Sequence, residues 1–308
     1  MAGSDTMSSD NPPWYERDER GEILVLEVPK RLKLHPEILR RGLQLEPVLP
    51  FKIGIVYLTS HLHPPQYVVK VLDTSTEERE VYERLWQAPS PHNHTIPGEI
   101  TPPDAGHPLL ITPYLTDCSL TCVLKPNPSD TLGLFVQLLE GIEYMHTLRI
   151  AHMDLCPDNI VIASHLAEQP RPDLIPNRVY IIDYGSSRQL ALGPGSQPAI
   201  TIGPSQVYLV HPPGDLKHFD PYSWDIYCAS HTMRQLFDEI HGKHSQPWLF
   251  RQYTVWLVGN ERGCLSACHC RPTARRARQV LMFIRQVVVL GEQCSALIDD
   301  IALMFFPG

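Results

Sequence analysis

The sequence has few of the features that mark membrane, secreted or nucleic-acid-binding proteins. No apolar run in its 308 residues approaches the ~18 residues that a membrane-spanning helix needs. The first twenty residues contain no basic stretch followed by an apolar one, so a secretory signal is not expected. Lys and Arg number 26 against 34 Asp and Glu, and the net charge of −8 does not favour binding to nucleic acid or an anionic membrane through bulk charge. The eight cysteines are spread along the chain and do not resemble a disulfide framework. We therefore expect an intracellular protein with reduced thiols in the cytoplasm, with the nucleus as the alternative.

Proline, in contrast, is abundant. The chain has 30 prolines, roughly double the usual share of about 5%. Long loops are therefore expected, although a hydrophobic content of 43% is enough for a sizeable core. The first twenty residues are polar, and we expect residues 1–40 to form a flexible extension.

Strand patterns dominate the first part of the chain and helical patterns the rest. Two β-branched and aromatic runs separated by HLHPP predict a hairpin, and Val81, Tyr82 and Leu85 mark one face of the helix that follows. The expected strands are Lys52–Ser60, Gln66–Leu72, Leu109–Leu115, Ile160–Ala163 and Val179–Ile182, and the expected helices are Thr74–Gln87, Ser129–Leu148 and one or two helices within Gln279–Phe306. This order predicts an α+β fold.

Two motifs carry the chemistry of the sequence. The run HMDLCPDN spans His152–Asn159, and DYG follows at Asp183–Gly185 after two short strands. In order and spacing these runs resemble the catalytic loop H-R-D-L-x-x-x-N and the metal-binding D-F-G of the protein kinases. Oxygen-donating side chains at these places suit Mg²⁺, a hard cation, and a carboxylate suits a reacting hydroxyl group.

The resemblance implies a bilobal kinase-like fold that uses ATP and Mg²⁺. A small antiparallel β N-lobe with one helix would span residues 41–115, and a larger, mainly α-helical C-lobe would span residues 116–306. Asp154 would orient or deprotonate the substrate hydroxyl group. Asn159 and Asp183 would bind the metal. Divergent motifs and a Pro-rich insertion at 164–178 make the chain similar to kinase-like proteins of fungi.

Three further residues are assigned to the nucleotide site by the same resemblance. Lys70 ends the run YVVK, which matches the V-A-I-K strand of the family, and it would bind the phosphates. A lysine on an apolar strand needs an anionic partner, and we predict Glu80 of the following helix as that partner, with Glu83 second. Thr112, in LLITPYL, is expected near the gate of the nucleotide pocket.

Two later segments extend the resemblance, which covers roughly Phe51–Leu290. In FDPYSWDIY, Asp225 resembles the aspartate that begins a helix and braces the catalytic loop. In CRPTA, Arg271 resembles the arginine near the end of the large lobe that pairs with the glutamate of the A-P-E motif.

The sequence also departs from the kinase pattern in four places. There is no G-x-G-x-x-G loop, and Gly54 is the one glycine close upstream of Lys70. Met153 stands where the catalytic loop usually has arginine, and Cys156 where Ser/Thr kinases have lysine. No A-P-E motif is recognisable, and Asp215 in HPPGD is the candidate substitute partner for the late arginine.

Three functions remain open. The first is phosphoryl transfer to protein hydroxyl groups, with Ser or Thr favoured over Tyr. The second is a pseudokinase that acts as a nucleotide-binding or scaffolding module. The third is a small-molecule kinase of the aminoglycoside or choline type, whose motifs also fit His152–Asn159, although the D-x-W and R-P-T-A segments argue against it. A Zn²⁺ site in Cys264–Cys270 and nucleic-acid binding by the basic run at Arg271–Arg278 are not expected.

Overall fold

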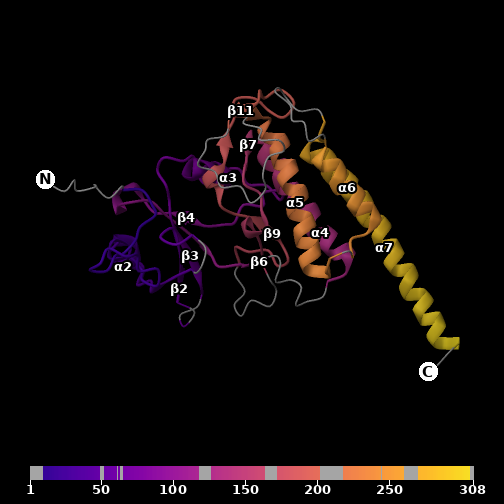
Figure 1. Cartoon of the computed structure of the whole chain (residues 1–308), viewed down its shortest axis with the longest axis horizontal. Coiled ribbons are helices and arrows are strands. Elements are labelled where there is room, and N and C mark those ends of the chain that lie inside the picture. Colours follow the sequence, from indigo (N-terminus) through magenta and orange to yellow (C-terminus); the bar gives the residue numbers. More distant parts are fainter. Residues whose placement is uncertain are drawn as a thin grey trace.

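The computed structural model describes residues 10–48, 52–60, 62, 65–117, 126–163, 172–201, 218–243, 245–259 and 270–305. The chain forms a small β-rich lobe followed by a larger helical lobe (Figure 1). This arrangement confirms the predicted α+β, bilobal fold. The residues that the sequence assigns to the nucleotide and metal site lie where the two lobes meet. The elements that matter most are therefore the strands and the helix of the first lobe and the loops of the second lobe that face it.

The first lobe is built on an antiparallel sheet with strand order β1-β2-β3-β5-β4. Its strands are β1 (Leu45–Pro47), β2 (Val56–Thr59), β3 (Tyr67–Val71), β4 (Glu99–Ile100) and β5 (Leu109–Pro113). The predicted hairpin is the pair β2–β3, in which Val56 is opposite Lys70. Strand β3 also pairs with β5, which places Leu110 opposite Lys70 and Thr112 opposite Val68. Lys70 and Thr112 therefore share one face of the sheet.

Helix α3 (Glu78–Gln87) packs on that face through the predicted stripe of Val81, Tyr82 and Leu85, all of which are buried. Sequence analysis placed the start of this helix at Thr74. In the structure Asp73 accepts hydrogen bonds from the backbone and hydroxyl group of Ser75, so residues 73–76 form a turn before the helix. Competition of this kind between short polar side chains and the helical backbone is typical of helix starts.

The opposite face of the sheet is covered by the N-terminal segment, which was predicted to be flexible. Residues 10–48 carry helices α1 (Lys30–Lys33) and α2 (Pro36–Arg41). Trp14, Val28, Leu32 and Ile38 are buried in a cluster with sheet residues such as Val69. The prediction of a flexible extension over residues 1–40 is therefore wrong from residue 10 onward, because four apolar side chains bury themselves against a sheet face that would otherwise be exposed.

The second lobe is organised around helix α4 (Pro128–Thr147), predicted as Ser129–Leu148, and helix α5 (Pro221–His241). A capping box between Asn127 and Asp130 begins α4, and the side chain of Asp220 caps α5. Helix α6 (Trp248–Val258) and helix α7 (Ala274–Phe305) complete the helical layer. Within the described residues, short strands form three small sheets at its edge: β6 (Thr116–Asp117) with β8 (Ile160–Ile162) and β9 (Val179–Ile181), β7 (Ile150–Ala151) with β10 (Arg188–Gln189), and β11 (Ile200–Thr201) with β12 (His218–Phe219).

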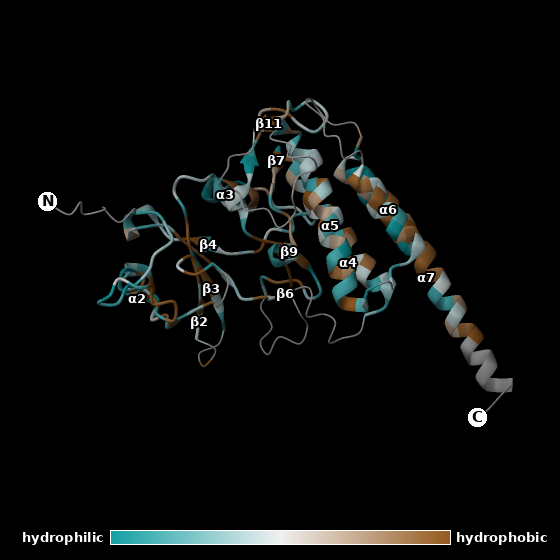
Figure 2. Cartoon of the chain, viewed as in Figure 1, coloured by the Kyte–Doolittle hydropathy of each residue, from teal (hydrophilic) through white to brown (hydrophobic). Residues whose placement is uncertain are grey.

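Helix α7 extends beyond the body of the lobe at its C-terminal end (Figure 1). Its first turns are packed inward, with Ala277, Leu281 and Ile284 buried, and apolar residues recur along the coloured part of the helix in Figure 2. Within Ala274–Ile298, a window of 18 residues has a mean hydropathy of 1.4, so this stretch is long and apolar enough to cross a membrane by length and composition alone, which revises the expectation that no such stretch exists. Length and composition do not separate a spanning helix from one that packs on its own lobe, as the first half of α7 does.

Candidate active site

Lys70 is held by two carboxylates at the junction of the lobes. Its side chain is 13% exposed, and its Nζ lies 2.6 Å from both Glu78 Oε1 and Glu78 Oε2 and 2.6 Å from Asp183 Oδ1. Burial alone would lower the pKa of Lys70, but the neighbouring carboxylates of Asp183 and Glu78 outweigh burial and raise it. The lysine therefore carries its charge at neutral pH and links strand β3, helix α3 and the Asp183 loop.

The partner of Lys70 on helix α3 was predicted to be Glu80, and this prediction is wrong. Glu78 is 2% exposed and makes the ion pair, whereas Glu80 is exposed. Residues three and four apart share a helix face, and Glu78 lies three residues before Val81 and four before Tyr82. The apolar stripe, which the sequence does reveal, was therefore the signal that could have identified Glu78.

Asp183 begins the DYG motif in a left-handed backbone conformation, with φ 66°. Its Oδ1 accepts from Lys70, and its Oδ2 contacts the ammonium group of Lys52, a residue that sequence analysis did not assign to the site. Burial would raise the pKa of Asp183, but Lys70 and Lys52 outweigh it and hold the pKa below its ordinary value. Asp183 is therefore ionised and presents a charged oxygen ligand at the junction of the lobes.

The DYG motif is also tied to helix α3 through two tyrosines. The ring of Tyr184, fully buried, lies edge-on to that of Tyr82 at a centroid distance of 4.7 Å. The backbone N–H of Asp183 donates to the hydroxyl oxygen of Tyr82 at 3.4 Å. Tyr184 in turn donates to the carbonyl of Ile181 at 3.2 Å, so its hydroxyl group, which phenylalanine would lack, has a partner.

The predicted catalytic loop brings Asp154 and Asn159 together. Asn159 Nδ2 donates to the backbone carbonyl of Asp154 at 2.8 Å, and the backbone carbonyl of Asn159 accepts from Ile182 N at 3.1 Å. His152 Nε2 lies 3.1 Å from the carbonyl of Ile182, while its Nδ1 accepts from Asp154 N at 3.3 Å. Burial raises the pKa of Asp154 above its ordinary value. These bonds join the loop directly to the strand that leads to Asp183.

Asp225, predicted to brace this loop, does so from the first turns of helix α5. Its Oδ2 accepts from His152 N at 2.8 Å and from His146 Nε2 at 2.9 Å, and its Oδ1 accepts from Met153 N at 2.8 Å. The residue is fully buried, and Trp224 Nε1 adds a bond of 3.0 Å to the carbonyl of Met153. A buried carboxylate is costly unless it is hydrogen-bonded, and here each oxygen has a partner.

The oxygens near the junction fit a bound Mg²⁺. Among the described residues, the buried Oδ1 of Asn159 has no hydrogen-bond partner, and Asp183 is an ionised carboxylate. A buried polar atom without a partner is uncommon in a folded protein and calls for an explanation such as an ion. Carboxylate and amide oxygens are the donors that Mg²⁺ takes from proteins, so the two residues predicted as ligands have the right chemistry.

Thr112, predicted near the nucleotide gate, is buried on β5 and lies two positions along the same sheet face as Lys70. Gly98, just before β4, packs so closely on this threonine that a Cβ atom added to the glycine would lie only 2.8 Å from Thr112 Cγ2. The threonine thus lies in close contact with the β4 side of the sheet. Its predicted role at a pocket gate stays a prediction.

Two of the departures from the kinase pattern fall inside the catalytic loop. Met153 takes a left-handed backbone conformation, with φ 70°, and its side chain is buried. It therefore cannot pair with an external anion as an arginine would. Cys156 is buried too, and burial, with Asp154 second, raises the pKa of its thiol to about 12. Neither residue supplies the positive charge that the family has at its position.

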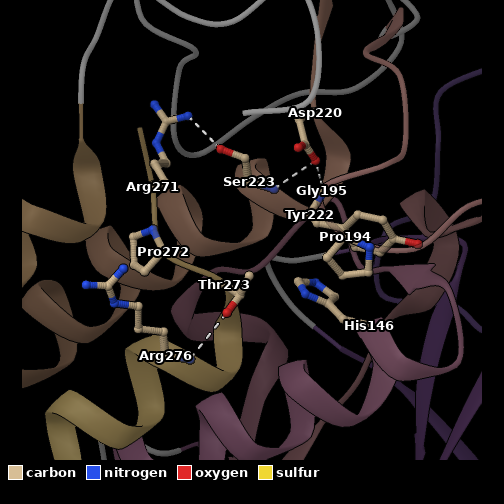
Figure 3. Close-up of a pocket in the computed structure, with 10 residues that line it drawn as sticks. All are labelled: His146, Pro194, Gly195, Asp220, Tyr222, Ser223, Arg271, Pro272, Thr273 and Arg276. Atoms are coloured by element: carbon tan, nitrogen blue, oxygen red, sulfur yellow. Dashed lines mark hydrogen bonds between the residues drawn. The ribbon is translucent and has the colours of Figure 1, made fainter. Parts of the chain in front are cut away.

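Among the described residues, the guanidinium group of Arg271 contacts helices α5 and α6. It donates to the carbonyl of Val258 at 2.7 Å and to Ser223 Oγ at 3.0 Å, and it lies over the ring of Tyr227 at 4.9 Å. Beside it is a cavity of about 180 Å³ between the start of α7 and the start of α5 (Figure 3). Its lining contains none of the predicted site residues, so this cavity is separate from the Lys70 site.

Two sequence-based predictions lie outside the described residues. Asp215, the candidate substitute partner of Arg271, is one of them. Cys264, Cys268 and His269 of the cysteine cluster also lie outside, and Cys270 at its end is half-buried. The expectation that the cysteine cluster does not bind Zn²⁺ and the pairing of Arg271 with Asp215 therefore both stay predictions.

Comparison with known proteins agrees with this geometry. A family model described as the protein kinase domain matches residues 53–208, about half of the chain. A putative serine/threonine-protein kinase of Acanthamoeba polyphaga mimivirus is 25% identical over 200 residues, which cover 61% of this chain and 66% of that protein. Serine/threonine-protein kinase par-4 of Caenorhabditis briggsae is 26% identical over 130 residues, covering 40% and 18%. Striated muscle preferentially expressed protein kinase of Danio rerio is 37% identical over 60 residues, covering 20% and 2%.

These relatives are matched over only part of their length, less than two thirds in each case. The family match begins just before β2 and contains Lys70, Glu78, the catalytic loop and the DYG motif. With its bilobal fold, the Lys70–Glu78 pair and the loop braced by Asp225, the chain belongs to the protein kinase domain family.

Proposed function

We propose that this chain transfers the γ-phosphoryl group of Mg·ATP to hydroxyl groups of proteins, with Ser or Thr as the acceptor. The observation that carries the proposal is the assembly of Asp183, Lys70 and Glu78 at contacts of 2.6 Å beside the Asp154–Asn159 loop. Phosphoryl transfer needs little covalent chemistry from the protein; it needs charges held in position. The Lys70 network and the braced loop supply that.

Each side chain has a role that its environment supports. Asp183 and Asn159 offer oxygens to the metal, and Lys70, ionised and held by Glu78, offers an ammonium group to the phosphates. In this proposal Asp154 accepts a hydrogen bond from the substrate hydroxyl group and orients it. When bound, Mg²⁺ neutralises charge on the phosphates and ATP supplies the group that is transferred.

The test is transfer of labelled γ-phosphate to the chain and to a generic protein substrate. Asp154→Asn removes the carboxylate, and Asp158→Asn is a matched control because Asp158 is exposed on the same loop. We expect label with the wild type and the control and a loss of about 10²-fold or more in Asp154→Asn, since acid–base groups contribute about 10²–10⁴-fold. Equal label with all three proteins would contradict the proposal.

A second candidate, a nucleotide-binding module without transfer activity, is favoured by one observation. Cys156 is a buried, uncharged thiol where the Ser/Thr kinases have a lysine, so one positive charge near the transferred group is missing. Mg·ATP binding that depends on Asp183, without transfer to any protein in the same assay, would favour this candidate. Label on small amines or sugars but not on protein would favour a small-molecule kinase.

A further inference from the structure

Lys52 lies in the turn that leads into β2, at the place where a glycine-rich loop would be. Its carbonyl accepts hydrogen bonds from Ile55 N at 3.0 Å and Val56 N at 3.1 Å, which close the turn. The residue has φ 54°, in the left-handed region that favours glycine. A non-glycine residue in that region persists only where its surroundings hold it, and such residues gather at functional sites.

The N-terminal segment holds this turn in place. Trp14 N donates to the carbonyl of Gly54 at 2.8 Å. Gly54 has φ 77°, and a Cβ there would lie 2.7 Å from Tyr15 Cε1 and 2.8 Å from the carbonyl oxygen of Trp14. The buried ring of Trp14 anchors the segment against the sheet. The backbone of the turn is therefore fixed, whereas a glycine-rich loop would be free to close over a ligand.

From this fixed turn the Lys52 side chain reaches Asp183. Its ammonium group contacts Oδ2, while Lys70 contacts Oδ1 of the same carboxylate. Lys52 is 40% exposed and Lys70 13%, so Lys52 approaches from the solvent side and Lys70 from within the lobe. Two ammonium groups thus meet one carboxylate at the residue proposed to bind the metal.

We propose that Lys52 binds the phosphates of the nucleotide and so replaces part of the phosphate binding that the backbone amides of a glycine-rich loop would provide. This inference rests on the proposed function. A dication at Asp183 repels the Lys52 ammonium group, and a polyphosphate beside that dication offers it a new partner within reach of a flexible four-carbon side chain. When Lys52 exchanges Asp183 for the polyphosphate and the dication takes its place at Asp183, every charge stays paired. The exchange needs no movement of the turn that is held by the Trp14–Gly54 hydrogen bond.

The test compares Mg·ATP with adenosine, which lacks phosphates, by calorimetric titration. Lys52→Gln removes the charge, Lys52→Arg keeps it, and Lys33→Gln is the matched control, because Lys33 is an exposed lysine of helix α1 in the same lobe. A hydrogen bond to a charged group contributes enough for an affinity change of about 10-fold to 100-fold. We expect Lys52→Gln to lose that much affinity for Mg·ATP and none for adenosine, with Lys52→Arg restoring most of it and Lys33→Gln matching the wild type.

The outcomes separate this inference from the function on which it rests. If wild type binds Mg·ATP and Lys52→Gln binds it equally well, or more tightly, Lys52 is not a phosphate-binding residue while the proposed function stands. Tighter binding would mean that the Lys52–Asp183 contact competes with the metal. If wild type does not bind Mg·ATP more tightly than adenosine, the proposed function fails and this inference fails with it.

Discussion

Replacement of Glu78 by glutamine removes the charged partner that helix α3 offers to Lys70. The structure gives this pair two contacts of 2.6 Å to a carboxylate that is 2% exposed. Removal of one member of a buried ion pair typically costs about 3–5 kcal/mol of stability. Because Lys70 keeps Asp183 as a second partner, we expect the low end, about 3 kcal/mol, for Glu78→Gln. For a domain of this size that is a fall of roughly 6 °C in Tm.

The same change is expected to lower the rate of phosphoryl transfer. If the lost positioning of Lys70 costs about 2 kcal/mol in the transition state, the rate falls about 30-fold. Glu80→Gln is the matched control, since it changes the same group two residues away on the exposed face, and it should shift stability by less than about 0.5 kcal/mol. Thermal unfolding and labelled-phosphate transfer measure both effects. Equal losses in the two variants, or a loss only in Glu80→Gln, would refute the assignment of Glu78.

Three further predictions follow from burial and hydrogen bonding. Asp225→Asn places an amide N–H₂ against backbone donors of the catalytic loop and should cost about 3 kcal/mol or more in denaturant unfolding; an unchanged midpoint would contradict the bracing role. Trp14→Ala should lower the free energy of unfolding by about 3 kcal/mol in the same measurement, because the indole ring is buried against the sheet. An unchanged free energy of unfolding would mean that the N-terminal segment is flexible after all. Cys156 should resist alkylation at pH 8 while exposed Cys294 reacts, because burial raises the pKa of Cys156 to about 12 and the reactive thiolate is scarce below that; mass spectrometry of both peptides decides this.

The sequence predicts most of the second lobe because its helices carry strong periodic signals. Helix α4 agrees with its predicted span to within one residue at each end, since the apolar stripe and the residues around Asn127 mark both the face and the start. The catalytic loop and the DYG motif were also recognisable, because their chemistry depends on residues close together in sequence. In each case the information is local.

Errors arose where the answer depends on packing between distant segments. Glu78 and Glu80 look alike in sequence, and only the rotation of helix α3 against the sheet separates them. The N-terminal segment is polar in its first twenty residues, yet Trp14 and Leu32 are buried by a sheet face formed later in the chain. Lys52 could not be placed from sequence, because its contact with Asp183 spans 131 residues.

The central claim is that Asp183, Asn159, Asp154 and Lys70 form one site for phosphoryl transfer. The most direct measurement is transfer of labelled γ-phosphate from Mg·ATP to protein by the wild type and by Asp183→Asn, each with Mg²⁺ and with a chelator. The account predicts label only with the wild type in Mg²⁺, because the variant loses the ionised carboxylate that is proposed to bind the metal. Label of equal intensity in Asp183→Asn, or transfer by the wild type that persists in chelator, would contradict it.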